Sequence, residues 1–584
     1  MNRKRWLLAA GAILMASCAK SPGPAVRSAL PAGLPAGALE VAAALGTAEL
    51  LEETKALSAD ALEGRAPGSR GDQLATEYLA RRLREIGCEP GFEGGAWEQP
   101  VEIVGVTARL PARWAFRSAG GTKESFRLRE DYMGGAGGAE PRVAIEDAEV
   151  VFVGYGIRAP EERWDDFKEA DLRGKVLLML NDDPDWDSQL FAGPRKLYYG
   201  RWTYKYESAA REGAAGAIIV HTTPSAGYPW DVVLNSWSGE QFSLPSGTEP
   251  RTPLEAWLTE DAAKRLAALG GHELAALIAQ ARSRDFRPVP LGIRTSIALE
   301  NGVRRTRTAN VAGILRGGDP ARAGEFVVLT AHHDHLGVGQ PDASGDRIYN
   351  GALDNGVAMA QVLAIARRFA ALPARPARSL MFLFPAAEEQ GTLGSWYFVR
   401  SGALSPDRIA ANVNFELGNV WGRTRDVVVY GKGKSSLEDL LAGIARAQDR
   451  VVTEERDARA GWYYRSDQFS FAKGGIPAIW FRSGTDVRGK PSGWGDAAWD
   501  AWISTRYHRP SDQVAADWDL EGLAEDARLG FLLGLAVADG KERPAWYPGD
   551  EFARKGQQPP EGEQSEERLR KRDSNRTPAH GQLK

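Results

Sequence analysis

Short apolar runs alternate with longer amphipathic segments throughout the C-terminal half of the chain. The runs have the length of buried strands, and most are followed by apolar residues spaced three or four positions apart, as on one face of a helix. The strands predicted in this way are 326–329, 379–384, 409–415, 427–430 and 476–481, and the helices are 356–371, 393–401 and 437–447. Because strands that alternate with helices are typical of α/β proteins, the sequence predicts a mostly parallel sheet with helices on both faces.

The pattern differs in the first half of the chain. Residues 48–88 have the pattern of a helix, a loop and a second helix, which Gly87 is placed to end. Between about 130 and 290, short apolar strands are separated by segments rich in Pro and Trp, and they are predicted at 150–157, 175–180 and 217–220. This change predicts a β-rich domain over 131–290, inserted between two catalytic segments, 46–130 and 291–545.

The two ends of the chain have compositions of their own. Basic residues at positions 3–5 precede an apolar segment and the sequence Met15-Ala16-Ser17-Cys18, which resembles a bacterial lipobox. The sequence therefore predicts a lipoprotein signal peptide over 1–17 and an Ala-, Gly- and Pro-rich tether over 18–45. An ordinary cleaved signal with an incidental Cys18 is the alternative. Residues 546–584 lose apolar residues and are predicted to be a disordered tail.

A lipidated Cys18 would place the exported protein on the bacterial cell envelope, with the outer membrane facing the periplasm as the expected location. The lipid is the only predicted contact with a membrane, since no internal apolar stretch is long enough to span one. The chain of 584 residues is 43% hydrophobic with a net charge of -4, and this near-neutral balance argues against nucleic acid as a partner. Cys88, the other cysteine, is interpreted as a packing residue.

Three of the seven histidines stand together directly after the strand 326–329, at His332, His333 and His335. Open α/β sheets bind their ligands beyond the carboxyl ends of the strands. Other residues able to bind metal occupy similar places after strands or at the start of a helix, namely Asp354, Glu388, Glu389, Glu416 and His508. Their joint placement predicts a group of ligands at one edge of the sheet. The isolated His221 and His272 are interpreted as packing or surface residues.

Carboxylates and imidazoles without thiolates suit zinc or a similar divalent ion in a hydrolase. One carboxylate can bridge two ions about 3.5–4 Å apart and help to hold a hydroxide between them. Asp334 lies two residues after His332 and could fix the orientation of that imidazole.

The order of these motifs resembles metallopeptidase family twenty-eight, which contains bacterial zinc aminopeptidases and glutamate carboxypeptidase. The matching segments are His332-His333-Asp334, Gly351-Ala352-Leu353-Asp354-Asn355-Gly356, Glu388-Glu389-Gln390-Gly391-Thr392-Leu393-Gly394-Ser395, Asn414-Phe415-Glu416 and Tyr507-His508-Arg509-Pro510-Ser511-Asp512. Arg465-Ser466-Asp467 and Gly475-Ile476-Pro477-Ala478 match a further segment, and the resemblance spans about 46–540.

The resemblance implies two zinc ions that Asp354 bridges. His332 and Glu416 would complete one metal site, and Glu389 and His508 the other. Glu416 is a departure, since the family often has Asp there, but the longer side chain is still expected to bind the metal.

The resemblance also implies the roles of residues that do not bind metal. Glu388 would be the general base, and Tyr507 would donate a hydrogen bond to the developing oxyanion. Asp334 would be the partner of His332. His333 and His335 are interpreted as neighbours rather than ligands.

The predicted insertion resembles the protease-associated domain found in some members of the family. The likeness rests on Phe152-Val153-Gly154-Tyr155-Gly156, Gly174-Lys175-Val176 and Gly213-Ala214-Ala215-Gly216-Ala217-Ile218. An unrelated β-rich insertion is the alternative.

The activity implied is hydrolysis of peptide bonds by a metal-bound hydroxide, and removal of N-terminal residues from a peptide substrate is the first expectation. A carboxypeptidase or amide hydrolase could use the same metal centre, and a glutaminyl cyclase would use related ligands around one zinc. A non-catalytic, receptor-like member should have lost the base or some ligands. Glu388 and all five ligand positions are present, which argues against that class.

Overall fold

The structure is a computed structural model that describes residues 34–35, 37–187, 190–245 and 251–553. Four neighbouring parallel strands form the centre of the catalytic sheet in the order β17–β14–β18–β21. Their bounds are Ser379–Phe384 for β17, Phe326–Thr330 for β14, Ile409–Asn414 for β18 and Ala478–Ser483 for β21. β13 (Val289–Leu315) on one side and β19 (Asp426–Val429) on the other are antiparallel to this centre, and β20 (Val451–Glu454) pairs in parallel with β19. The predicted mostly parallel sheet is confirmed.

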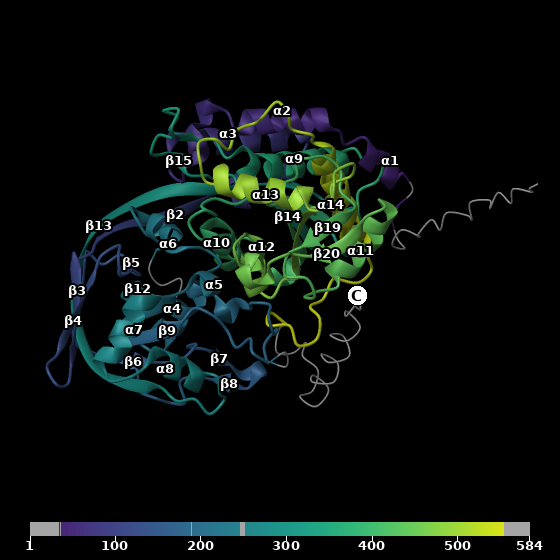
Figure 1. The fold of residues 1–584 in the computed structure, drawn as a ribbon. Coiled ribbons are helices and arrows are strands. Elements are labelled where there is room, and N and C mark those ends of the chain that lie inside the picture. The colour runs from purple at the N-terminus through teal and green to yellow at the C-terminus, as the bar shows by residue number, and fades with distance from the viewer. Residues whose placement is uncertain (1–33, 36, 188–189, 246–250, 554–584) are drawn as a thin grey trace, which may run out of the picture.

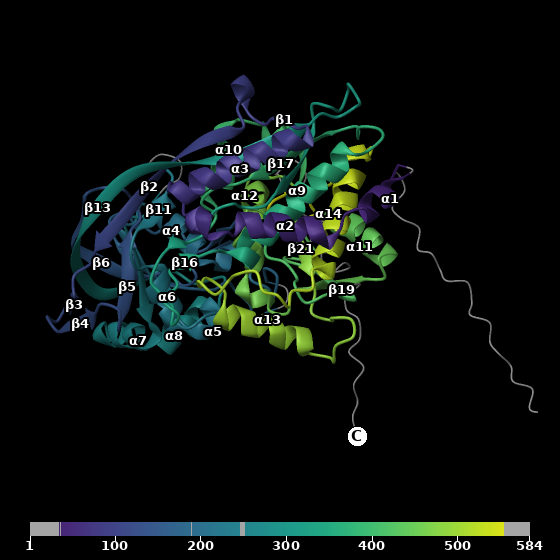
Figure 2. The same cartoon turned by 90° about the horizontal axis from the view of Figure 1, so that it is seen from above.

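Helices cover both faces of this sheet, as the sequence predicts. Alternate residues of β14 point to opposite faces, so Val327 and Leu329 join one core while Phe326 and Val328 join another. The first core includes α1 (Ala38–Ala43), α2 (Thr47–Leu57), α3 (Arg70–Ile86), α9 (Val357–Ala370), α11 (Leu437–Ala447) and α14 (Glu521–Asp539). The second includes α10 (Leu393–Ser401) and α12 (Gln468–Lys473). Figures 1 and 2 show α2, α3, α9 and α14 gathered together on the catalytic part of the molecule.

Two long strands continue from the catalytic sheet into the rest of the molecule. β2 (Glu98–Arg109) pairs with the middle of β13, and the C-terminal end of β13 pairs with β17. The N-terminal half of β13 pairs with β6 (Arg142–Phe152) and with β3 (Arg113–Ser118). Buried and exposed residues alternate along 291–299, as expected for a strand with one face in a core. The sequence shows the same alternation of apolar and polar residues, but the strand at 291–299 is not among those predicted above.

The segment between β2 and β13 forms a second, mainly β-rich unit. One of its cores lies within the unit, and the other also includes Tyr463, Tyr464 and Phe469 of the catalytic domain. Its remaining strands are β4 (Lys123–Arg127), β5 (Tyr132–Ala136), β7 (Arg158–Ala159), β8 (Trp164–Asp165), β9 (Val176–Leu180), β10 (Gly216–His221), β11 (Gln241–Ser243) and β12 (Leu254–Thr259). Its helices are α4 (Trp202–Arg211), α5 (Thr223–Ala226), α6 (Trp230–Ser236), α7 (Glu260–Leu269) and α8 (Leu274–Ala281). Trp114, Phe116 and Phe126 are buried in this core, so the hairpin β3–β4 packs with the unit predicted at 131–290 rather than with the catalytic segment. Figure 1 shows the unit beside and below the catalytic part.

Three sequence predictions need correction. The strand predicted at 150–157 ends at Phe152, because Gly154 and Gly156 have left-handed φ angles of 59° and 62°. The predicted tether is wrong for residues 38–45, where α1 forms over Ala38–Ala43 and where Ala38, Ala42 and Leu45 are buried in the catalytic core. The predicted tail is wrong for 546–553, because Trp546 is buried and Phe552 packs on Tyr464. The rest of the tail lies outside the described residues, as does most of the tether.

The remaining short elements surround the sheet. They are β1 (Glu89–Pro90), β15 (Gly337–Val338), β16 (Ile348–Tyr349) and α13 (Trp494–Thr505). In the described part of the chain, no helix is long and apolar enough to cross a membrane.

Candidate metal centre

The candidate site begins where β14 ends. His332, His333, Asp334 and His335 continue directly from this strand, and all four are fully buried. In the parallel register, Thr330 at the end of β14 lies opposite Leu383 of β17 and Asn414 of β18. The residues that follow these three strands therefore meet at one edge of the sheet, as the sequence predicts.

The first group of potential ligands combines His332, Asp354 and Glu416. Nε2 of His332 lies 3.4 Å from Oδ1 of Asp354 and 3.3 Å from Oε1 of Glu416. All three residues are buried, and their ligand atoms lie within 4.8 Å of one another. The second oxygen of Glu416 accepts a hydrogen bond of 2.7 Å from the Ser466 hydroxyl. The structure thus places the longer Glu416 side chain beside His332 and Asp354, the two residues with which it was predicted to bind a metal ion.

The second group of potential ligands also contains Asp354. Nε2 of His508 lies 3.3 Å from Oδ2 of Asp354 and 3.1 Å from Oε2 of Glu389. His335 lies here too, with Nδ1 at 2.6 Å from Oε1 of Glu389. His335, Asp354 and Glu389 have ligand atoms within 4.8 Å of one another, so His335 contacts this group more closely than the sequence interpretation implies.

A short turn holds Asp354 between the two groups. Gly351 precedes this turn with a left-handed φ of 58°, and a Cβ there would lie 2.1 Å from the Asp354 carbonyl oxygen and 2.7 Å from the His335 ring. The position therefore requires glycine. The Asp512 carboxylate accepts hydrogen bonds from the backbone N–H groups of Leu353 and Asp354 and fixes the turn from the other side. The Asp354–Asn355 peptide bond is cis.

The donor set fits divalent zinc. It contains only carboxylate oxygens and imidazole nitrogens, which zinc hydrolases use together. Among the described residues, Nε2 of His335 is buried without a hydrogen bond, and Oδ1 of Asp354 and Nε2 of His508 face other potential ligand atoms without forming a hydrogen bond of normal geometry. Buried polar atoms are normally paired, so three such atoms at one place indicate a ligand that the protein atoms do not supply.

The comparison with protein families agrees with this geometry. Residues 310–531, which include both ligand groups, match the model of Peptidase family M28. The matched residues, which make up less than half of the chain, are therefore similar to a peptidase family M28 domain, and this likeness supports hydrolysis of peptide bonds. None of the curated proteins matches the chain. The matched residues 310–531 do not include the insertion, so the protease-associated domain expected at 131–290 stays a prediction.

Solved structures with partial likeness to the chain include aminopeptidases. An aminopeptidase from Aneurinibacillus sp. strain AM-1 is 19% identical over 86% of this chain and 96% of its own, with a TM-score of 0.48. The zinc aminopeptidase of Bacillus subtilis is 18% identical over 85% and 97% with a TM-score of 0.41. A Peptidase M28 precursor from Shewanella amazonensis is 16% identical over 87% and 97% with a TM-score of 0.40.

Asp334 has a different position from the one expected. Its carboxylate lies 3.7 Å from Nδ1 of His332, whereas the Asp334 backbone oxygen is 3.1 Å from that nitrogen. The carboxylate instead accepts hydrogen bonds of 2.9 and 3.2 Å from the backbone N–H groups of Glu388 and Glu389. The expected role for the Asp334 side chain is corrected accordingly, since it orients the two glutamates rather than the imidazole.

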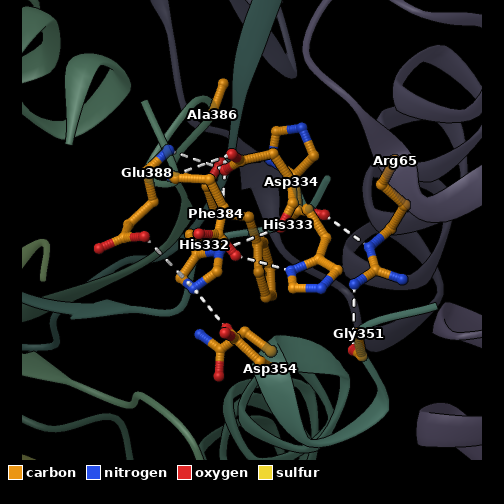
Figure 3. Close-up of polar contacts among 12 residues, drawn as sticks. Arg65, His332, His333, Asp334, Gly351, Asp354, Phe384, Ala386 and Glu388 are labelled. Atoms are coloured by element: carbon orange, nitrogen blue, oxygen red, sulfur yellow. Dashed lines mark hydrogen bonds and ion pairs between the residues drawn. The ribbon is translucent and has the colours of Figure 1, made fainter. Parts of the chain in front are cut away.

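Glu388 and Glu389 are adjacent in the chain but differ in their electrostatic surroundings. Burial raises the pKa of Glu388 well above its usual value, with Glu416 and Glu389 adding to the rise and His332 opposing it. Burial would also raise the pKa of Glu389, but His508 and His335 outweigh it and lower that pKa to about 2. Figure 3 shows Glu388, His332 and Asp354 directed toward one another. One glutamate is thus suited to hold a proton and its neighbour to stay ionised.

Tyr507 lies beside the second group. Its ring stacks on the imidazole of His508, with ring centroids 3.9 Å apart. Burial and the surrounding carboxylates hold the pKa of Tyr507 well above its usual value. The phenol therefore stays protonated and can donate a hydrogen bond, as its predicted role requires.

Arg65 is a residue of the site that the sequence interpretation does not identify. It is fully buried and donates hydrogen bonds to the backbone oxygens of His333 at 2.7 Å, Asn350 at 2.7 Å and Gly351 at 3.1 Å. Figure 3 shows it on the side of the His333–Asp334 segment away from Glu388. His333 is held in turn by Asp72, whose carboxylate lies 2.9 Å from Nε2. The turn-rich sequence 63–68 is the only local signal of this contact.

Proposed function

We propose that the protein is a dinuclear zinc aminopeptidase that removes N-terminal residues from peptides. One observation carries the proposal: the two oxygens of Asp354 face different ligand groups. Oδ1 is 3.4 Å from Nε2 of His332, and Oδ2 is 3.3 Å from Nε2 of His508. A carboxylate placed in this way is suited to bridge two metal ions.

The proposed roles of the residues follow from their positions. Zinc ions held by these ligands would polarise the scissile carbonyl and lower the pKa of water. Oε2 of Glu388 lies 3.8 Å from Nε2 of His332, close to both metal groups. Glu388 takes the proton of the attacking water and later gives it to the leaving nitrogen. Its raised pKa matches this exchange, because the carboxyl group can hold the proton between the two steps.

Tyr507 completes the proposed reaction. Its hydroxyl donates a hydrogen bond to the oxygen that becomes negative as water adds to the carbonyl carbon. The Asp334 carboxylate keeps the backbone of Glu388 and Glu389 fixed while the proton moves.

A small pocket beside the second ligand group supports action on a chain end. Its volume is about 330 Å³, at the low end for ligand pockets. Its lining comes from the segment 66–69, from the inserted unit, and from residues next to the ligands; it includes Glu240, Phe242, Arg304, His335, Leu336 and Gln390. A pocket of this size suits a terminal residue better than an extended chain.

The test compares matched peptides that differ only at the N-terminus. Metal analysis should give two zinc ions per chain. The zinc-loaded protein should hydrolyse leucyl peptides at least about a hundredfold faster, by kcat/KM, than the same peptides with an acetylated N-terminus. Equal rates would reject the aminopeptidase specificity in favour of a carboxypeptidase or amide hydrolase. One zinc per chain would reject the dinuclear centre.

We further propose that the protein is exported and anchored to the cell envelope through Cys18, and that the inserted unit is a protease-associated domain. The export signal and Cys18 lie outside the described residues, so this proposal rests on the sequence Met15-Ala16-Ser17-Cys18 alone. The insertion lies between β2 and β13, which themselves belong to the catalytic sheet.

A further inference from the structure

Residues 546–553, which follow α14, form a clasp between the catalytic domain and the inserted unit. Trp546 is buried, and its indole N–H donates a hydrogen bond of 3.2 Å to the Gly475 carbonyl oxygen. The backbone N–H of Tyr547 donates to the carbonyl oxygen of Lys434 at 2.8 Å. Figure 1 shows the clasp in yellow, below α11. These contacts fix its first residues on the catalytic domain.

Glu551 is the residue of the clasp at which three segments meet. Its side chain is only 6% exposed. Oε2 accepts a hydrogen bond of 3.2 Å from the backbone N–H of Tyr198 in the inserted unit. Oε1 accepts from Nζ of Lys434 at 2.7 Å and from the Tyr464 hydroxyl at 2.6 Å. Because a buried carboxylate is costly unless its oxygens are paired, these three donors determine where Glu551 lies.

Aromatic rings surround the same contact. Nζ of Lys434 lies 5.0, 5.5 and 5.1 Å from the ring centroids of Tyr463, Tyr464 and Phe552. Burial and the charge of Glu551 hold the pKa of Tyr464 well above its usual value, so its hydroxyl stays a donor. The clasp therefore holds Tyr464 both by a charge-assisted hydrogen bond and by packing.

The turn that contains Tyr464, residues 462–466, leads directly to the first ligand group. Ser466 donates the 2.7 Å hydrogen bond to Oε2 of Glu416. Asn414 donates to Oγ of Ser466 and to Oε1 of Gln468, both at 2.8 Å, and Gln468 donates to the backbone of the turn. A short path of contacts thus joins the clasp to Glu416.

The second ligand group is built from other segments. Glu389 follows β17, and the Asp334 carboxylate holds its backbone. His508 follows α13. The turn 462–466 supplies none of the ligands proposed for this group. A movement of the turn should therefore disturb the first group more than the second.

We propose that the clasp positions Glu416 through the turn 462–466 and so sets how tightly the first ligand group holds its metal ion. The inference rests on the dinuclear centre of the proposed function and adds Glu551 as a positioning residue. Groups that orient a metal ligand typically change metal affinity about 10–100-fold. Because Glu551 acts on Glu416 through Tyr464 and Ser466, we expect an effect at the lower end of this range.

Glu551→Gln in the full-length chain is the first test. The amide has a single acceptor oxygen, so it cannot satisfy the donors on both sides of Glu551. We expect the zinc affinity of the first group to fall about tenfold and that of the second group to change less than about twofold. Competition with a zinc-binding dye measures both affinities, and Glu416→Ala identifies which of them belongs to the first group.

Asp439→Asn is the matched control. Asp439 accepts a 2.9 Å hydrogen bond from the Tyr547 hydroxyl, at the other end of the clasp and in an exposed place. This variant should leave both zinc affinities unchanged, because the contact it removes does not involve the turn 462–466.

Two further variants separate positioning from a general loss of stability. Tyr464→Phe removes only the hydroxyl that binds Glu551, so it should weaken the first group selectively even if Glu551→Gln does not fold. In a Glu416→Ala background, Glu551→Gln should cause no further loss at the first group, because the residue through which it acts is missing. Equal weakening of both groups, an additive effect in the double variant, or unchanged affinity in Tyr464→Phe would overturn the proposal.

Zinc binding and peptide hydrolysis keep this proposal separate from the proposed function. If the wild-type protein binds two zinc ions but cleaves no peptide, and Glu551→Gln weakens the first ion selectively, the clasp stands and the proposed function fails. If the wild-type protein cleaves leucyl peptides but Glu551→Gln binds both ions as tightly as the wild type, the clasp fails and the proposed function stands. A single zinc ion in the wild type rejects the dinuclear centre, and the clasp then stands only if Glu551→Gln and Glu416→Ala both weaken that ion.

Discussion

At the scale of single residues, the chemistry depends on the difference between Glu388 and Glu389. The backbone N–H groups of both residues donate to the Asp334 carboxylate. Only the Glu389 side chain, however, lies beside two imidazoles, those of His335 and His508. The two pKa values differ because the adjacent side chains point in different directions: Glu388 points toward His332, and Glu389 points toward His335 and His508. A residue beside a metal group but not required by it is the one that can carry the proton.

We expect Glu388→Gln to retain both metal ions and to lower kcat by about a hundredfold or more, because an amide cannot accept the proton. Metal analysis and steady-state kinetics on one preparation check this result, with the surface variant Glu454→Gln as the control. Near-normal activity in a metal-replete Glu388→Gln protein would remove Glu388 from the role of base.

The length of the Glu416 side chain is matched to its surroundings, since one oxygen faces His332 and the other accepts from Ser466. Glu416→Asp should shorten this reach and weaken the metal shared with His332, and Glu416→Ala should weaken it further. Graded chelation followed by metal analysis checks the order of loss, in which the metal at Glu389 and His508 should be retained longer. Two ions bound as tightly in Glu416→Ala as in the parent would show that Glu416 is not a ligand.

His335 lies 2.6 Å from Oε1 of Glu389, and His508 lies 3.1 Å from Oε2 of the same carboxylate. We expect His335→Ala to weaken metal binding at the second group by about 10–100-fold, because partners that orient a ligand have effects of this size. Competition with a zinc-binding dye measures the affinity. His272→Ala is the control, since His272 lies in the inserted unit away from the site. Equal affinity in both variants would mean that His335 only fills space.

At the scale of elements, the metal centre depends on segments far apart in the sequence. The turn at 60–65 supplies Arg65, β14 leads into His332, and the turn before α9 supplies Asp354. Arg65 bonds to carbonyl oxygens of the second and third of these segments. It therefore holds together loops that have no regular hydrogen-bonding pattern of their own.

Replacement of Arg65 should loosen this junction. Arg65→Gln removes several charge-assisted hydrogen bonds in a buried place, and we expect a loss of about 3 kcal/mol or more in the free energy of unfolding. Urea denaturation of the metal-free protein measures the change, and Arg70→Gln, an exposed arginine of the same region, is the control. A change below about 0.5 kcal/mol would contradict the structural role given to Arg65.

At the scale of the whole molecule, the inserted unit is joined to the catalytic domain by continuous strands rather than by a flexible linker. β13 pairs with β17 of the catalytic sheet at one end and with β6 of the inserted unit at the other. The residues 546–553 add a second contact. Oε2 of Glu551 accepts a hydrogen bond of 3.2 Å from the backbone N–H of Tyr198 in the inserted unit, while Oε1 binds Lys434 of the catalytic domain at 2.7 Å.

Export is a property of the whole chain, and the predicted signal for it lies outside the described residues. If Cys18 carries the lipid, Cys18→Ala should release the protein from membranes or leave it unprocessed. Fractionation and mass measurement of the N-terminus check the outcome, with Cys88→Ala as the control because Cys88 is buried beside α3. A mature, cleaved Cys18→Ala protein that stays in the membrane fraction would show that the lipobox interpretation is wrong.

The sequence by itself determined the elements of the catalytic sheet and the order of the residues that meet at its edge. Short apolar runs such as 379–384 have the length of buried strands, and the residues that follow parallel strands meet at one edge of the sheet. His332, Asp354, Glu389, Glu416 and His508 could therefore be assigned from their positions after strands together with the family motifs. The alternation along 291–299 would also have predicted the start of β13.

Only the tertiary structure decided which side chains touch. Arg65 and His333 are 268 residues apart, and no local pattern predicts their hydrogen bond. The Asp334 carboxylate binds the backbone of Glu388 rather than His332, because the choice depends on how two loops approach each other. The same holds for Tyr198 and Tyr464, which come from different units and meet at Glu551. A sequence fixes which groups are available, but contacts between distant segments depend on the packing of the whole chain.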